Sequence, residues 1–366
     1  MSVERGNGAP VLDLSRGGVE VEIDVAEAAE VLMSICALGD RSDYETLDVG
    51  AEWLHRRLDV VPPDLLAAVD ELQLGSMKIA AHLLGLVLET PKPRTFAAFL
   101  ERLRETDPVE LKLHLFGYYG SGFSRLAGPD VIERAAGGDT EAQKAFLDSL
   151  AEHSDKHEST RLLLELPGEE MKARLLDLLP SWYEAVFEPS SEEWRDAAER
   201  DVESKRALAA RYAPERLVEL TLRGYQYTPT PQIRTLALFP NWWMRPWVLL
   251  WEHKGTKVFC YPIAPSAEEG ASPAEVARVY KALGDEGRLK LLRRLSEGPL
   301  KLSEAAAELG VAKSTAHHHL AILRQAGFVA IRDEDENVYS LRSDPPAAGE
   351  LLGAYLGSSR SSAKSA

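Results

Sequence analysis

Closely spaced stop signals between residues 272 and 342 constrain the fold of this 366-residue chain more than any other feature. Ser272 can cap one helix, and Pro273 stands at the first position of that helix. Asp285 can cap a second helix. Gly298-Pro299 and Gly327 end helices, because glycine accepts the left-handed cap conformation and proline cannot continue a helix. The predicted elements are helices over 273–283, over the leucine-rich stretch after Asp285, over 303–309 and over 313–326, then strands over 328–332 and 338–342.

The fourth of these helices has one apolar and one polar face. Its buried stripe is expected at Ala316, Leu320 and Leu323, at helical spacing. Ser314, His317, His318 and Ala321 then lie on the opposite side, and Gly310-Val311 forms a tight turn before the helix. The third and fourth helices therefore have the spacing of a helix-turn-helix, and the two strands form a hairpin, or wing.

The residues that carry this pattern resemble a known family. The segments ALGDEGRLKLL, from Ala282 to Leu292, and LSEAAAELGVAKSTAHHHLAILRQAGF, from Leu302 to Phe328, look like an ArsR-type winged helix-turn-helix transcriptional regulator. The resemblance covers about a quarter of the chain, and its most specific part is the sequence of the fourth helix. It implies a homodimer whose fourth helices enter successive major grooves of a roughly palindromic operator in double-stranded DNA.

Side chains near the start of the fourth helix are the candidate DNA-binding residues. Hydroxyl, ammonium and imidazole groups there suit phosphates or base edges, and nearby arginines suit the DNA backbone. The predicted set is Lys313, Ser314, Thr315, His317 and His318, with Arg288 and Arg324 as backbone-positioning charges. By the resemblance, dimer contacts come from Val276, Tyr280, Leu351, Leu352 and Tyr355. The alternative is a winged helix used only for protein contact.

Several residues depart from the family pattern. Lys301 and Ser303 stand where metal-sensing members carry a Cys-x-Cys pair, so we expect neither a metal site of the usual type nor a cofactor. Ala312 replaces the serine that would cap the fourth helix, a change that costs about 1 kcal/mol of local helix stability. The wing tip, 333–336, carries four carboxylates that would repel phosphates, so we expect it to point away from DNA or to weaken binding.

Charge divides the chain into two unequal parts. From Pro273 onward there are 13 Lys+Arg and 12 Asp+Glu, which leaves 29 Lys+Arg against 46 Asp+Glu, a net charge of -17, before it. The run 265–272 is small, acidic and turn-forming, which is typical of a linker. We therefore expect an acidic sensing or interaction domain over 1–264, a DNA-binding domain over 273–356 and a flexible tail over 357–366.

The first domain is predicted to be mainly helical with small β elements. Residues 19–24 alternate like a strand and 26–38 follow as a helix. Amphipathic helical segments continue to about Arg223. Then β-branched and aromatic residues over 233–239, 247–251 and 257–261 predict a small closing sheet, the last two strands joined as a hairpin.

A tryptophan cluster suggests a ligand site in this domain. Four of the seven tryptophans lie between residues 242 and 251, beside Arg245. Aromatic walls with a few polar groups suit an apolar or aromatic small molecule, although an ordinary core would use the same residues. The candidate ligand-binding residues are Trp242, Trp243, Trp247 and Arg245, with Tyr225 and Tyr227 as further polar groups.

Enzymatic and membrane functions find little support in the sequence. No nucleophile, base and orienting group occur at a recognisable spacing. His153 and His157 are more typical of a solvated helix face than of a zinc site, and the three consecutive histidines at 317–319 diverge around a helix. Two distant cysteines and no long apolar run indicate a cytoplasmic protein. We expect a non-enzymatic repressor with a small-molecule or protein effector; the alternatives are a protein-interaction module and an enzyme fused to its regulator.

Overall fold

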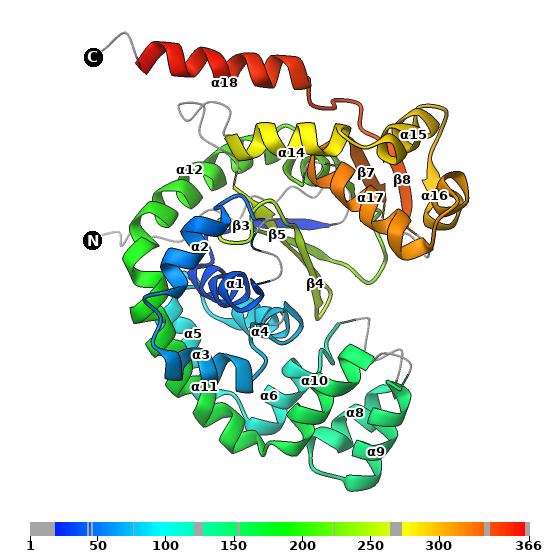
Figure 1. Ribbon diagram of the computed structural model, residues 1–366. Helices are drawn as coiled ribbons and strands as arrows, with labels where there is room; N and C mark the ends of the chain where they lie inside the picture. Colours follow the sequence, from blue (N-terminus) through cyan, green and yellow to red (C-terminus); the bar gives the residue numbers. More distant parts are fainter. Residues whose placement is uncertain are drawn as a thin grey trace, which may run out of the picture.

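The computed structural model describes residues 19–41, 44, 47–75, 77–120, 127–151, 154–222, 224–263, 273–332 and 337–362. The chain is mainly helical, with two small sheets, as predicted (Figure 1). The predicted linker and wing tip lie outside the described residues. No helix among the described residues is long and apolar enough to cross a bilayer.

A helical layer makes up most of the first 222 residues. Proline at the first position begins four of its helices, α3, α6, α8 and α13, because a missing N–H costs nothing there; α14 in the C-terminal part begins in the same way. The helices of this layer are α1 (Glu27–Gly39), α2 (Ala51–Leu58), α3 (Pro63–Glu71), α4 (Met77–Glu89), α5 (Phe96–Glu105), α6 (Pro108–Leu115), α8 (Pro129–Ala136), α9 (Thr140–Ser149), α10 (Ser154–Glu165), α11 (Gly168–Trp182), a π turn at Tyr183–Phe187, α12 (Ser191–Ala209) and α13 (Pro214–Thr221).

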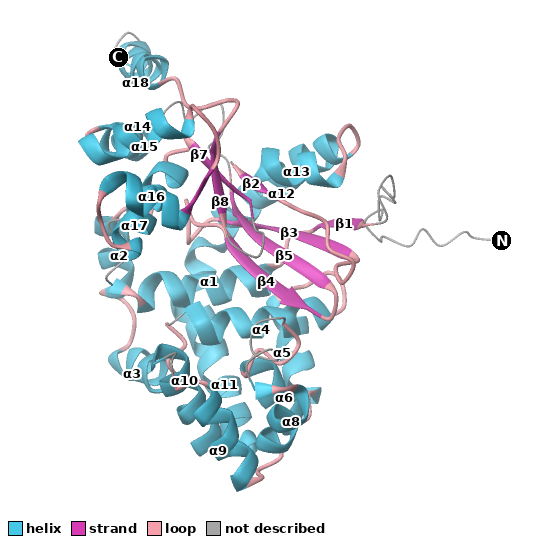
Figure 2. Cartoon of the chain, turned by 90° about the vertical axis from the view of Figure 1, so that its right-hand side faces the viewer, coloured by secondary structure: helices cyan, strands magenta, loops and turns pink. Residues whose placement is uncertain are grey.

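The first sheet has α1 and α4 on one face and α12 on the other (Figure 2), and a hydrophobic core lies against each face. Its strands are ordered β1 (Glu20–Ile23), β3 (Thr235–Asn241), β5 (Thr256–Pro262) and β4 (Leu249–His253); only β4 is antiparallel to its neighbour. Successive side chains of a strand point to opposite faces. Ala237 and Phe239 therefore join the core of α1 and α4, whereas Leu236 and Leu238 join a second core on the other face.

The β4–β5 hairpin is the one that the sequence predicts. Lys254 and Gly255 form its two-residue turn, and both have positive φ. Such a turn matches the twist of antiparallel strands, and glycine adopts its conformation without steric cost. The predicted strand over 19–24 is also confirmed, but it pairs in parallel with β3, from more than 200 residues further along the chain.

The C-terminal part has the order of elements of a winged helix. It contains α14 (Pro273–Leu283), α15 (Glu286–Leu295), β6 (Leu300–Lys301), α16 (Leu302–Leu309), α17 (Lys313–Gln325), β7 (Val329–Arg332), β8 (Val338–Leu341) and α18 (Ala348–Ser362). The flexible tail is predicted to begin at residue 357, but α18 continues to Ser362. In the leucine-rich stretch after Asp285, Leu291 and Leu295 are buried, whereas Leu289 lies on the outer side of α15 and is 48% exposed.

The winged helix is joined to the rest of the chain by a shared sheet and a shared core. The short strand β2 (Tyr225–Gln226) pairs in parallel with β7, so that the second sheet has the order β2-β7-β8-β6. The second core contains Leu217 and Leu222 of the first part together with Leu291 and Leu320 of the winged helix. The position of the winged helix is thus determined by packing as well as by the connection between the two parts.

Candidate nucleic-acid interface

The helix-turn-helix is formed by α16 and α17, which lie side by side (Figure 1). Gly310, between them, ends α16 with a φ of 66°, a conformation that side chains other than glycine adopt at a cost. Ala316, Leu320 and Leu323 are fully buried against the other helices, as the spacing predicts. Burial of this stripe orients α17 and leaves its other face to solvent.

The outer face of α17 gathers the predicted contact residues over its first two turns. Lys313, Ser314, Thr315, His317 and His318 are all exposed. Ala312 is the N-cap residue of α17, and its side chain accepts no hydrogen bond from the N–H groups of the first turn. Free N–H groups at a helix N-terminus attract anions such as phosphate. This end of α17 therefore offers a lysine, two hydroxyls and two imidazoles to a ligand outside the protein.

His319 points a different way from its two neighbours. Its Nδ1 lies 3.6 Å from Oδ1 of Asp285, and its side chain is only 18% exposed. Asp285 in turn caps α15 by accepting a hydrogen bond from the Arg288 N–H at 2.9 Å. The three consecutive histidines thus diverge, and His319 packs toward the start of α15.

Two arginines predicted to contact the DNA backbone have other roles. Arg288 is 9% exposed, and its guanidinium donates to the carbonyl oxygens of Ala282 at 2.8 Å and Lys281 at 2.7 Å. It therefore satisfies the end of α14 instead of reaching phosphate. Arg324 lies in the last turn of α17, more than two helical turns from the exposed end of that helix. It lines a cleft between α17 and the first part of the chain.

The tryptophan cluster does not form one aromatic pocket. Trp243 is fully buried and Trp242 nearly so, and the ring centroids of both lie within 5.5 Å of that of Trp53. These two rings belong to the core beside α1. The other two predicted ligand residues, Arg245 and Trp247, line the same cleft as Arg324.

A buried carboxylate holds the backbone of this cluster. Glu30 is 1% exposed, and its Oε1 accepts hydrogen bonds from the N–H groups of Trp242 and Trp243, both at 2.8 Å. Burial raises the pKa of Glu30 to about 7, although the two N–H groups and the charge of Arg245 oppose the shift. Glu30 is not among the residues predicted from the sequence; the signal that could have found it is a single carboxylate in a helix whose residues 28–38 are otherwise apolar or small.

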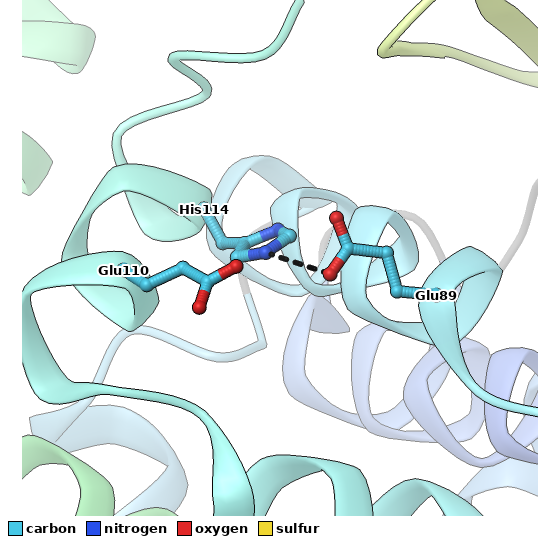
Figure 3. Close-up of side chains that lie close together, drawn as sticks. All are labelled: Glu89, Glu110 and His114. Carbon is cyan, nitrogen blue, oxygen red and sulfur yellow. Dashed lines mark ion pairs between the residues drawn. The ribbon is translucent and has the colours of Figure 1, made fainter.

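A second missed cluster surrounds Glu89, at the end of α4. Figure 3 shows its carboxylate, Glu110 and the buried His114 turned toward one another, with 3.7 Å between Glu89 Oε2 and His114 Nε2. Potential ligand atoms of the three residues lie within 4.8 Å of one another, which is close enough to hold a metal ion. The cluster belongs to α4 and α6, which are separate from the helix-turn-helix in both ribbon views.

Cations already compensate these carboxylates. Arg102 Nη2 lies 2.7 Å and Lys254 Nζ 2.5 Å from oxygens of Glu89, and His253 Nε2 lies 2.9 Å away. Burial by itself would raise the pKa of Glu89, but these neighbours and His114 outweigh it and lower the pKa. The arrangement is therefore accounted for as an ion-pair network that ties α4, α5 and α6 to the β4–β5 turn.

The other histidine pair considered from the sequence is His153 and His157. Residue 153 lies outside the described residues, as does the side chain of residue 157.

Comparisons with known proteins agree with the helix-turn-helix geometry. Residues 285–330 match the model of the family "Bacterial regulatory protein, arsR family". The chain is 39% identical over 71 residues to the uncharacterized HTH-type transcriptional regulator YceK of Bacillus subtilis, which covers 19% of this chain and 71% of that protein. It is 39% identical over 69 residues to the cadmium resistance transcriptional regulatory protein CadC homolog of Staphylococcus aureus. This match covers 19% of this chain and 57% of that protein.

A third relative gives a longer match. The biofilm growth-associated repressor of Agrobacterium fabrum is 32% identical over 91 residues, which are 25% of this chain and 76% of that protein. No solved structure matches the chain. The exposed face of α17, the capped helices before it and these matches lead to one conclusion: through its C-terminal winged helix, the chain belongs to the arsR family of DNA-binding transcriptional regulators.

Proposed function

We propose that the protein is a cytoplasmic repressor that binds a roughly palindromic operator as a homodimer and occludes the promoter. One observation carries the proposal: the buried stripe of α17 turns Lys313–Thr315, His317 and His318 outward together at one end of the helix. The N-terminal residues of a recognition helix are those that contact base edges and phosphates in the major groove. These five residues are the proposed DNA contacts.

The dimer surface is proposed at α14 and α18, which lie along one another at the edge of the molecule (Figure 1). Tyr280 is 41% and Leu356 54% exposed there, and Leu351, Leu352 and Tyr355 are half-buried. Val276, the fifth predicted dimer residue, is buried in the protomer. Large apolar side chains left at the surface of a protomer favour an interface with a second copy.

The acidic first part is proposed to receive the regulatory signal without catalysing a reaction. Its net charge of -17 over residues 1–272 repels the DNA backbone, which would keep this part away from the duplex and lower non-specific affinity. Lys301 and Ser303, at the start of α16, occupy the positions of the expected metal-binding cysteines. The signal is therefore proposed to be a small molecule or a protein other than the metal ions of the usual sensors.

The test is selection of bound fragments from random DNA by the full-length protein, followed by a salt titration on the best fragment. We expect an inverted repeat with half-sites about one helical turn apart, and a log K that falls linearly with log salt. No enriched sequence at low salt, with a folded dimer confirmed by sedimentation, would refute operator binding.

Matched variants locate the contacts. Lys313→Ala should weaken binding to all sequences and lower the salt slope by about 1, because one phosphate contact is lost. His318→Ala should reduce the discrimination between half-site sequences. Lys144→Ala is the control, since this lysine is 79% exposed on α9, at the opposite end of the molecule from α18. Equal effects of the two lysine variants would contradict the assignment of α17.

A further inference from the structure

A cleft lies between the winged helix and the segment that follows β3. Its walls include Arg245 and Trp247 from that segment, Tyr225 of β2, Arg278 of α14 and Arg324 of α17. Residues of both parts of the chain are therefore needed to form it. Among the elements that line it, α17 is the recognition helix and β2 pairs with β7 of the wing.

The lining carries more positive than negative charge. Three arginines, at 245, 278 and 324, face two carboxylates, Asp48 and Glu275. Asp48 is ion-paired with Arg278, and Arg245 donates from Nε to the carbonyl oxygen of Trp242 at 3.1 Å. The net charge of the lining is +1, which suits one anionic group.

Arg324 is the arginine of this cleft for which the described residues provide no ion-pair partner. No carboxylate within the described part of the chain forms an ion pair with it, and burial lowers the pKa of its guanidinium. A half-buried charge without a partner is costly, and a carboxylate offers the planar, two-oxygen acceptor that a guanidinium binds through two parallel hydrogen bonds.

The remaining wall is apolar. Pro246, Trp247, Val248 and Ile263 contribute to it, and Tyr225 adds a second aromatic ring. Aromatic and aliphatic walls with one convergent charged group are typical of sites for small organic molecules. The free volume is about 70 Å³, well below the roughly 150 Å³ of a cavity that holds benzene. A short aliphatic acid comes nearest to this volume, and a ligand with an aromatic ring enters only if the two walls separate.

We propose that this cleft binds a small organic carboxylate with an apolar or aromatic body, its carboxylate on Arg324, and that this binding regulates the affinity for DNA. The coupling follows from the position of Arg324 on α17 and of Tyr225 on β2, the strand that pairs with β7 of the wing. A ligand that separates the cleft walls displaces the helix that carries the proposed DNA contacts. The regulatory half of this inference rests on the proposed function.

Binding is tested first without DNA. Isothermal titration of the full-length protein with benzoate, isobutyrate and acetate should show saturable binding of at least one, with benzamide, the neutral analogue of benzoate, binding at least about tenfold more weakly. Arg324→Gln should weaken carboxylate binding by at least about tenfold. Arg211→Gln, an exposed arginine outside the cleft, is the control.

The outcomes separate clearly. Equal affinity in wild-type protein and Arg324→Gln, or no saturable binding of any of the three acids up to about 10 mM, overturns the site. If circular dichroism shows that Arg324→Gln does not fold, Arg324→Lys replaces it, because lysine keeps the charge but loses the two-pronged geometry. The comparison of benzoate with benzamide uses wild-type protein alone and decides the need for an anion in either case.

Regulation is tested with the bound acid on the selected operator. The acid should change operator affinity, and the operator should change affinity for the acid by the same factor, because coupling between two sites is reciprocal. Arg324-dependent binding with unchanged operator affinity would overturn the regulatory half alone. Absence of DNA binding both with and without the acid, while acid binding is intact, would refute the proposed function and leave the carboxylate site standing.

Discussion

Replacement of Glu30 by glutamine should make the stability of the protein less dependent on pH. The buried carboxyl has a pKa of about 7, whereas it ionises near 4.5 when the chain unfolds. The native state therefore binds an additional proton between these values, and this contribution to stability is lost as the pH rises through 7. At about 1.36 kcal/mol for each pKa unit, the full loss is about 3 kcal/mol.

Glutamine can keep the two hydrogen bonds, because its carbonyl oxygen still accepts from the N–H groups of Trp242 and Trp243, but it has no charge to bury. Between about pH 5.5 and pH 8.5, the unfolding free energy of wild-type protein should fall by about 2 kcal/mol relative to Glu30→Gln. Other titrating groups contribute equally to both proteins and cancel in this difference.

Urea unfolding, followed by tryptophan fluorescence at four pH values, measures the difference. Glu30→Ala is the companion variant: it removes both hydrogen bonds and should be destabilised relative to Glu30→Gln by a similar amount at every pH, since two buried N–H groups lose their acceptor. The reasoning would be refuted if the unfolding free energies of wild-type protein and Glu30→Gln differed by the same amount, within about 0.5 kcal/mol, from about pH 5.5 to pH 8.5.

Three further predictions concern the packing around the sheet. Gly85→Ala should destabilise the protein by about 1–3 kcal/mol in thermal or urea unfolding, because the new methyl group would lie 2.5 Å from Nδ1 of His253. The control Gly349→Ala, where the new methyl group would meet no atom within 4 Å, should not destabilise the protein. Equal effects of the two variants would contradict this packing. Burial lowers the pKa of His253, so the unfolded state binds one more proton than the native state and the unfolding free energy should fall as the pH drops below about 6.5. If a His253→Gln variant lost the same stability over this pH range, His253 would not be the cause. Cys36 and Cys260 are buried thiols whose pKa is raised by burial, to about 12 for Cys36, so a maleimide should label neither until the protein is unfolded; rapid labelling of the native protein would count against this core.

Local signals predict most of the winged helix correctly. The helix from Pro273 to Leu283, the capping of the next helix by Asp285 and the break at Gly310 all involve residues close together in the sequence. The apolar stripe of α17 follows from the helical period alone. The β4–β5 hairpin is equally local, because its register depends on a two-residue turn.

The functional roles of the arginines could not be predicted in this way. Arg288 and Arg324 have the same charge and both lie in the winged helix, yet one satisfies two carbonyl oxygens and the other lines a cleft. Charge counts describe how many cations a segment carries. They contain no information about which of them finds a partner from another element.

The sequence by itself determined the elements whose residues are neighbours along the chain: capped helices, the helix-turn-helix spacing and the hairpins. Only the tertiary structure decided that β1 pairs with β3, that β2 extends the wing sheet, and that Glu30 holds the backbone of Trp242 and Trp243. The physical reason is that helical period, capping and tight turns act over a few residues. Pairing between distant strands, burial of a carboxylate and the walls of a cleft depend on which surfaces meet when the whole chain packs.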